Sequence, residues 1–406
     1  MSGLPAVVVE GARGVGKTAT ASRRAATVVT LDRAAEREIV IASPASVLAA
    51  TRPLFIDEWQ RVPDVWNEIR HAVDDGAEPG SFLLAGSSSP IDDAELHSGA
   101  GRFVRVHMRP MNLVERGVAE PTVSLASLLG DETAQVGGTT PLTLTDYAEE
   151  IMRSGFPGIR SVGRLDLISD LLRDYANQIV QHDIPDSGEK IRRPKSLFEW
   201  LSAYAAATGT TASYASLLTS ATPGQDEKPS KVTTMSYRDV LTRMWVLDPL
   251  EAWAPSTSHL KRLGQAPKHH LVDPALAASL VGVGFETLLK GGGPTVDGTF
   301  LGSLFESLAV QHVRVLAQGN SCGVFHMREL GGRHEVDMII RRPDSKVVAC
   351  EVKLSSTVRP KDVSNLNWLE AQAPELVLDK ILINTGPYAY RRKDGVAVVP
   401  LGLLGM

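Results

Sequence analysis

A glycine-rich octapeptide near the start of the chain carries the clearest chemical signal. Residues 11–18 read Gly-Ala-Arg-Gly-Val-Gly-Lys-Thr and match the pattern G-x-x-x-x-G-K-[ST] in full. Glycines let consecutive backbone N–H groups curl around phosphate oxygens without Cβ clashes. We expect Lys17 to bridge the β- and γ-phosphates of a nucleotide and the Thr18 hydroxyl to ligate Mg²⁺. The loop positions expected to line the phosphates are Gly11, Ala12, Arg13, Gly14, Val15 and Gly16.

An acidic pair closes a later apolar stretch, and it fits the same chemistry. Residues 53–58 read Pro-Leu-Phe-Ile-Asp-Glu, the pattern of a buried strand that ends in two carboxylates. In a sheet that carries a phosphate loop, the first acid holds the Mg²⁺ water shell and an adjacent glutamate polarises the attacking water. We therefore predict Asp57 as a metal ligand and Glu58 as a catalytic base. The pair suits water activation better than a substrate hydroxyl, which disfavours a kinase.

Two further positions are candidates for phosphate contacts. The apolar run 81–86 is followed by three serines, and we expect Ser87 to contact the γ-phosphate or the attacking water. A serine-rich turn without such a contact is the alternative. Arg102 is expected to supply positive charge to a phosphate, in the same chain or in a neighbouring subunit, and an ordinary surface arginine is the alternative.

Four residues in the last third of the chain have the types and spacing of a metal-dependent nuclease site. Asp337 lies in an alternating stretch, while Glu351 and Lys353, two residues apart, project from one face of the next strand. Glu306, on a predicted helix before them, completes the group. Two or three carboxylates around a divalent metal, with a lysine that orients water, form the D…E-x-K arrangement. The alternative is a salt-bridged pair on an exposed strand.

The elements that must position these residues show as alternating patterns. Apolar runs at 4–9, 27–31, 53–58 and 81–86 alternate with helical stretches, which predicts a doubly wound parallel α/β sheet. Because the carboxyl ends of parallel strands meet at one edge of a sheet, the loop and the acids are expected together there. The chain returns to α/β patterning from about residue 299.

The stretch between the two α/β regions is helical, from about residue 145 to residue 280. We expect a winged-helix-like middle domain, in which residues 230–238 begin a recognition helix with Lys231 and Arg238 near DNA. The alternative is a winged helix that contacts protein. Residues 119–142 are expected to be the most mobile connection. The predicted domains are residues 1–143, 144–296 and 297–406.

Length, charge and cysteine content restrict the class of protein. The 406 residues exceed what one hydrophobic core supports, so two or three domains are expected. A formal net charge of -5 argues against a broad basic surface that coats nucleic acid and leaves room for a local basic face. The two cysteines, the start of the chain and the lack of a long apolar run lead us to expect a cytoplasmic protein with no membrane partner.

Together these motifs resemble a bacterial and archaeal family of AAA-type ATPases, in which an ATPase domain precedes the domain of unknown function 4143. The resemblance implies ATP binding, a winged-helix middle and a C-terminal restriction-endonuclease-like fold of the PD-(D/E)xK type. It does not imply a biological role. The segments that carry it are 11–18, 54–63, 79–89, 154–159, 171–184, 267–276, 302–310 and 334–356, with Arg102 and Glu115.

From these patterns we expect an ATP-dependent switch or motor that uses Mg²⁺. Its nucleotide state would control the C-terminal nuclease-fold domain, which would act on DNA or RNA. The alternative is a slow regulatory module that binds a nucleoside triphosphate and recruits protein partners through an inactive nuclease-like fold. AAA-type sites often lie between subunits, so a homo-oligomer is also expected.

Overall fold

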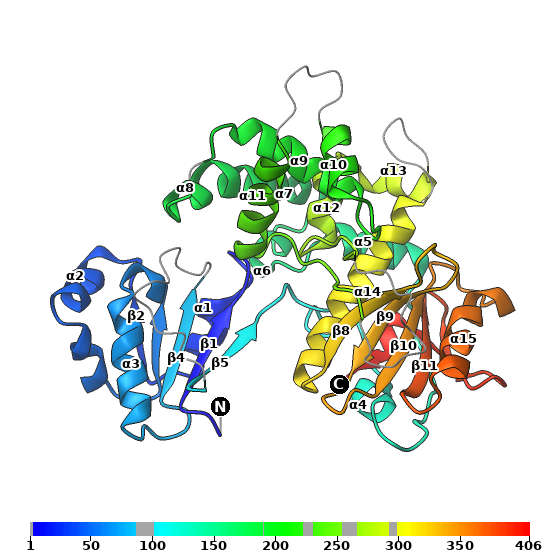
Figure 1. Ribbon diagram of the computed structural model, residues 1–406, viewed down its shortest axis with the longest axis horizontal. Coiled ribbons are helices and arrows are strands. Elements are labelled where there is room, and N and C mark those ends of the chain that lie inside the picture. Colours follow the sequence, from blue (N-terminus) through cyan, green and yellow to red (C-terminus); the bar gives the residue numbers. More distant parts are fainter. Residues whose placement is uncertain (1–2, 87–100, 190, 222–229, 254–265, 292–298) are drawn as a thin grey trace. The chain divides into compact units, whose positions relative to one another are not determined.

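The computed structural model describes all residues except 1–2, 87–100, 190, 222–229, 254–265 and 292–298. The chain divides into two compact units, which are described separately (Figure 1). The first unit consists of residues 1–109, 178–192 and 236–246, and the second of residues 110–177, 193–235 and 247–406. The middle of the sequence thus contributes to both units. The predicted limits of three domains stay a prediction.

A five-stranded parallel sheet forms the centre of the first unit, in the order β2-β3-β4-β1-β5. Parallel pairing requires a crossover between strands, and the helices that follow β1, β2 and β3 supply it. Two inner strands of this sheet, β1 and β4, are mostly apolar because helices cover both faces. The strands are β1 (Ala6–Glu10), β2 (Thr27–Thr30), β3 (Leu54–Asp57), β4 (Phe82–Gly86) and β5 (Phe103–His107).

Alternate residues of these strands pack on opposite sides of the sheet. Val8, Ile56 and Leu84 belong to a core with Val40 of α2 and Trp66 of α3. The intervening strand positions form a smaller core with α1 on the other face. This two-sided burial fixes the register of each strand, because a slip of one residue would exchange the faces. The helices are α1 (Lys17–Ser22), α2 (Ala34–Ala42) and α3 (Asp64–Asp74).

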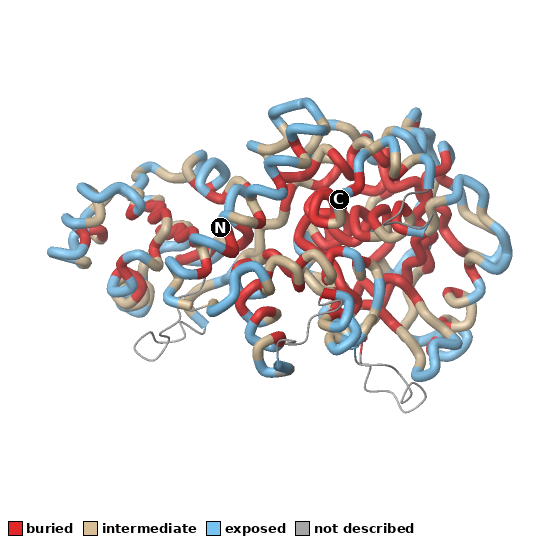
Figure 2. Tube along the Cα trace, turned by 90° about the horizontal axis from the view of Figure 1, so that it is seen from above, coloured by how far each residue is buried: buried red, intermediate tan, exposed pale blue. Residues whose placement is uncertain are grey.

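The second unit combines helices with a mixed sheet. Figure 2 shows that the chain around the C-terminal end is largely buried. Its longest helix, α14 (Phe300–Gly319), contacts three strands of the sheet and the helices α5, α12 and α13. The other helices are α5 (Leu144–Met152), α6 (Pro157–Arg160), α7 (Leu165–Gln178), α9 (Pro194–Ala206), α10 (Tyr214–Ala221), α12 (Pro274–Val281), α13 (Phe285–Lys290) and α15 (Ser364–Gln372). Helix α11 (Lys231–Arg243) has residues in both units.

The sheet of the second unit has seven strands in the order β7-β12-β13-β11-β10-β9-β8. Strands β10, β11 and β13 run parallel, and the other pairs are antiparallel. Strands β9 and β10 are the two alternating stretches predicted from the sequence. The bounds are β7 (Gly138–Thr139), β8 (Gly323–Arg328), β9 (Glu335–Arg341), β10 (Val347–Val352), β11 (Val377–Asn384), β12 (Tyr388–Arg391) and β13 (Ala397–Pro400).

The expectation of a mobile connection at residues 119–142 is wrong. This stretch contains β6 (Val123–Ser124), which pairs with β14 (Leu404–Gly405), and β7, which pairs with β12. Between them lies α4 (Leu125–Leu128), whose two leucines are buried. The stretch is held by pairing with the distant end of the chain, and such pairing leaves no local sequence signal. No helix in the described part of the chain is long and apolar enough to cross a membrane.

A buried histidine links α14 to the two ends of the second unit. The Nδ1 atom of His312 accepts a hydrogen bond from the Leu113 N–H at 3.3 Å, and its Nε2 atom donates to the Leu404 carbonyl at 2.9 Å. The bond to Nδ1 requires the neutral ring, because a protonated Nδ1 cannot accept. Burial lowers the pKa of His312 to about 4. Because an unfolded histidine binds a proton near pH 6.5, this site resists protonation only in the folded chain.

We expect His312→Gln to reduce the acid sensitivity of folding. In the wild-type chain the histidine contribution is fully present above about pH 6.5 and is lost as the pH falls toward about 4. Between pH 7 and pH 5 this amounts to about 2 kcal/mol of unfolding free energy, and the variant should lack that slope. Urea unfolding at both pH values measures it, with exposed His182→Gln as the control. An unchanged slope in His312→Gln would contradict the assignment.

Candidate functional site

The phosphate loop predicted from residues 11–18 connects the end of β1 to the start of α1. Gly14 and Gly16 have φ angles of 77° and 103°, a region that favours glycine. At Gly11 the reason is space, since a Cβ there would lie 2.2 Å from the Met108 carbonyl oxygen. Backbone conformation and close packing therefore both require the glycines of the motif.

Lys17, the first residue of α1, lies folded against its own loop. Its Nζ atom donates hydrogen bonds to the Gly11 carbonyl at 2.8 Å and to the Ala12 carbonyl at 3.0 Å. Burial lowers the pKa of Lys17 to about 8, although the Glu58 and Asp57 carboxylates act in the opposite direction. The ammonium group, the loop and both acids are thus close enough to interact electrostatically.

Thr18 and Asp57 form the link between the loop and the acidic pair. The Thr18 hydroxyl donates to Asp57 Oδ2 at 2.8 Å, and Asp57 is 5 % exposed. Burial raises the pKa of Asp57. Its second oxygen, Oδ1, is buried and accepts no hydrogen bond from any residue in the described ranges. A hydroxyl and a carboxylate with a free oxygen are hard ligands of the kind that Mg²⁺ prefers, so these residues fit that ion.

Glu58 follows the strand in an unusual backbone conformation. Its φ of 55° is left-handed, which is uncommon for a residue other than glycine and typical of functional sites. The short helix η2 (Trp59–Arg61) begins directly after it. Within this helix Gln60 donates from Nε2 to Glu58 Oε2 at 2.6 Å. The sequence pattern predicted Glu58 but gave Gln60 no role.

Arg13, predicted to line the phosphates, is paired with a carboxylate from elsewhere in the first unit. Its guanidinium contacts Asp183, which ends the π-helix η3 (Ile179–Asp183). Burial raises the pKa of Asp183, and the Arg13 charge opposes that effect. Sequence reasoning missed Asp183 because no local pattern connects residue 183 with a loop at residue 13.

The structure does not bring Arg102 to the phosphate loop of the same chain. Strands β1 and β5 run parallel, with Ala6 beside Phe103 and Glu10 beside His107. Arg102 therefore lies at the amino end of the sheet, opposite the loop, where it pairs with Asp74 at 2.5 Å. A role in a neighbouring subunit stays a prediction. Ser87 lies outside the described residues.

The second predicted cluster does gather in the second unit. Asp337 of β9 and Glu351 of β10 lie on adjacent antiparallel strands, and Asp337 Oδ2 accepts a hydrogen bond from the Val352 N–H at 2.9 Å. Lys353 Nζ lies 2.7 Å from Glu351 Oε2 and 3.8 Å from Asp337 Oδ2. Burial raises the pKa of Glu351 well above its usual value. The spacing of the motif correctly placed these side chains together.

A lysine that the sequence pattern did not reveal occupies the centre of this cluster. Lys268 is 1 % exposed, and its Nζ atom lies 2.9 Å from Glu306 Oε1, 3.0 Å from Asp337 Oδ1 and 3.1 Å from Glu335 Oε1. Burial lowers the pKa of Lys268, but the three carboxylates more than compensate and hold it well above its usual value. Burial also raises the pKa of Glu306 to about 7.

This arrangement does not fit a divalent metal at Asp337, Glu351 and Glu306. The Lys268 ammonium takes the position between Glu306 and Asp337 that a cation would need. Within the described residues, no three histidine, cysteine, aspartate or glutamate side chains form a group that could hold a metal ion. Lys268 and Lys353 offset part of the negative charge of the four carboxylates. The second oxygen of Glu351, Oε1, is buried and accepts no hydrogen bond from the described residues.

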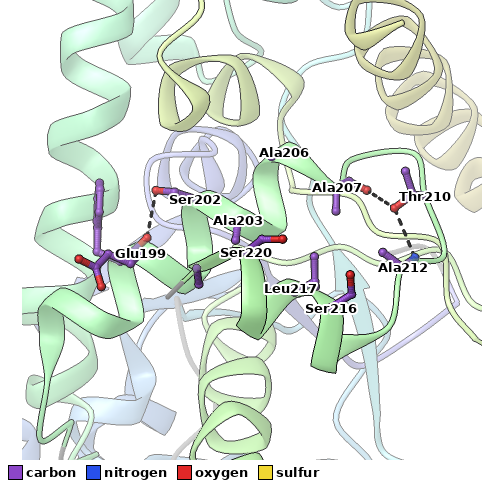
Figure 3. Close-up of a pocket in the computed structure, with 12 residues that line it drawn as sticks. Glu199, Ser202, Ala203, Ala206, Ala207, Thr210, Ala212, Ser216, Leu217 and Ser220 are labelled. Carbon is purple, nitrogen blue, oxygen red and sulfur yellow. Dashed lines mark hydrogen bonds between the residues drawn. The ribbon is translucent and has the colours of Figure 1, made fainter. Parts of the chain in front are cut away.

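A separate open pocket lies in the second unit between α9 and α10, with a volume of about 790 Å³ (Figure 3). Its lining is mostly alanine and serine, with Glu199 as its charged member. The Ser202 and Thr210 hydroxyls donate to the carbonyls of Phe198 and Ala207, so they are already engaged. None of the predicted site residues lines this pocket.

Comparison with protein families identifies three segments. Residues 4–116 match the model of an AAA domain, and residues 301–404 match a domain of unknown function, DUF4143. Residues 144–287 match a second domain of unknown function, DUF8612. The AAA match contains the phosphate loop and the acidic pair, and the DUF4143 match contains Glu306, Asp337, Glu351 and Lys353.

Similar proteins include two uncharacterized proteins of Mycobacterium bovis and Mycobacterium tuberculosis, each 27% identical over 316 residues. The match covers 75% of this chain and 62% of each relative, so the chain spans less than two thirds of their length.

Two solved structures are similar at 14% identity. A Walker-type ATPase of Pyrococcus abyssi has a TM-score of 0.40 and covers 68% of this chain and 91% of its own. The ORC2 protein of Aeropyrum pernix, in ADPNP and ADP complexes, has a TM-score of 0.29 and covers 71% and 90%. The chain thus carries an AAA domain at residues 4–116 and a DUF4143 domain at residues 301–404.

Proposed function

We propose that this protein binds ATP with Mg²⁺ at the phosphate loop and hydrolyses it. The observation that carries the proposal is the Thr18–Asp57 hydrogen bond, which joins the loop after β1 to the acids at the end of β3. Lys17 lies buried beside both acids. Mg²⁺, held by Thr18 and by Asp57, would neutralise charge on the phosphate oxygens.

The residues of the loop and the acidic pair have distinct tasks in this reaction. Lys17 exchanges its bonds to the Gly11 and Ala12 carbonyls for bonds to the β- and γ-phosphate oxygens. Glu58 accepts a proton from a water molecule as the water oxygen attacks the γ-phosphorus. The bond from that phosphorus to the bridging oxygen breaks, and ADP leaves with the electron pair.

For the second unit, binding of a partner is favoured over cleavage of nucleic acid. A metal-dependent nuclease needs carboxylates that can accept a divalent ion, and here the Lys268 ammonium is already ion-paired with three of them. The favoured function is therefore a nucleotide-controlled switch that recruits protein partners through a nuclease-like fold without cutting activity. The alternative is a homo-oligomer whose nucleotide state controls an active nuclease on DNA or RNA. The position of Lys268 among the carboxylates disfavours this alternative.

We expect Glu58→Gln to lower ATP turnover by at least about 100-fold, because an amide cannot accept the proton and general-base catalysis contributes roughly 10²–10⁴-fold. ATP affinity should change by less than about twofold, since the groups that contact phosphate remain. Phosphate release and titration with a fluorescent ATP analogue measure the two quantities. Exposed Glu78→Gln is the matched control. Undiminished turnover in Glu58→Gln would exclude this residue as the base.

We expect Lys268→Met to destabilise the second unit by roughly 3–5 kcal/mol, because it leaves buried carboxylates without their cation. Lys290→Met, which removes an exposed lysine beside Glu286, should leave stability nearly unchanged. Urea unfolding followed by the fluorescence of buried Trp200 and Trp253 measures the difference. Equal stability of the two variants would show that Lys268 does not hold the cluster together.

We also expect the wild-type chain to cut neither linear nor circular DNA, nor RNA, in Mg²⁺ or Mn²⁺. The Lys268 ammonium lies between Glu306 and Asp337, where the cation needed for phosphodiester cleavage would have to bind. Gel electrophoresis after incubation, with and without ATP, provides the measurement. Cleavage that disappears in the Asp337→Ala/Glu351→Ala double variant would instead establish a nuclease.

A further inference from the structure

Gln60 has a place in the site that neither the sequence motif nor the proposed reaction assigns. Its Nε2 atom donates to Glu58 Oε2 at 2.6 Å, from a position two residues away on η2. This contact holds the same carboxylate that would accept the proton. Gln60 therefore contacts the proposed base directly.

The orientation of the amide group follows from its neighbour. Only the NH₂ end of an amide can face a carboxylate, because two oxygen atoms would repel each other. The amide oxygen of Gln60 consequently points away from Glu58. That oxygen is buried and accepts no hydrogen bond from any residue that the structure describes. The position of this oxygen is therefore determined by packing against the end of β4.

Gly86, the last residue of β4, provides the space for the amide oxygen. A Cβ at this position would lie 2.5 Å from Gln60 Oε1 and 3.1 Å from Trp59 Nε1. The backbone of Gly86 does not have a positive φ, so conformation alone does not require glycine there. The glycine is explained by the Gln60 amide group and the Trp59 indole, which both pack against it.

We propose that Gln60 is a positioning residue for the water-activating Glu58, wedged between that carboxylate and the backbone of Gly86. The hydrogen bond restricts the orientation of the Glu58 carboxylate. Glu58 itself has a left-handed backbone, with a φ of 55°. The inference rests on the proposed hydrolysis of ATP.

The first test separates turnover from binding in the full-length chain. Gln60→Ala removes the hydrogen-bond donor. Gly86→Ala keeps the Gln60 side chain but displaces its amide group. In both variants we expect kcat for ATP hydrolysis to fall at least about tenfold, with the ATP Kd within about twofold of the wild-type value. Gln372→Ala at the exposed end of α15 and Gly302→Ala, where a Cβ meets nothing within 4 Å, are the matched controls.

The second test combines the two substitutions. If Gly86→Ala acts by displacing the amide, it should not lower kcat further once residue 60 is alanine. We therefore expect the kcat of Gln60→Ala/Gly86→Ala to equal that of Gln60→Ala. Independent, multiplying losses would overturn the proposed contact. So would a loss of ATP binding in parallel with turnover, which indicates a purely structural role.

These outcomes also distinguish the inference from the proposed function. If Gln60→Ala hydrolyses ATP at the wild-type rate, the role of Gln60 is overturned and the proposed ATPase activity stands. No detectable turnover in the wild-type chain, with ATP still bound, overturns the hydrolysis and the positioning role together. Reduced kcat with unchanged Kd in both single variants, and no additivity in the double variant, supports the inference.

Discussion

The hydrogen bond from Thr18 to Asp57 is the contact on which the first unit depends. It spans three strands, since β4 lies between β1 and β3, and it forms only if all three end at the same edge in register. Parallel pairing and burial on both faces enforce that register. The apolar core around Trp66 and the glycines of the loop thus position the Thr18 hydroxyl and the Asp57 carboxylate 2.8 Å apart.

Much of this arrangement could be predicted because its signals are local. Four of the five strands of the first sheet are apolar runs with a polar end, and the loop is a continuous motif. The fifth strand, β5, was missed because Arg105 and His107 interrupt its apolar sequence. Asp183 was missed for another reason: a carboxylate gains its role from a partner that folding brings near, here Arg13. Gln60 lies only two residues from Glu58, but its position depends on the left-handed backbone of Glu58 and on Gly86, which no local pattern reveals.

The second unit shows how one unforeseen side chain changes the chemistry of a recognised pattern. The motif correctly placed Asp337, Glu351 and Lys353 on facing strands, because the alternation of a strand determines which residues share a face. Lys268 belongs to the segment before α12, and nothing in its neighbourhood marks it as a partner of β9. Its ammonium group nevertheless forms ion pairs with candidate metal ligands.

The self-contact of Lys17 has a consequence for which ligands the loop accepts. The ammonium already has two carbonyl partners at 2.8 and 3.0 Å, so an incoming molecule must offer replacements for both. In the proposed ATP complex, oxygens of the β- and γ-phosphates would together replace both carbonyls. On that proposal, a nucleoside monophosphate, which has neither phosphate, would leave Lys17 bound to its own loop.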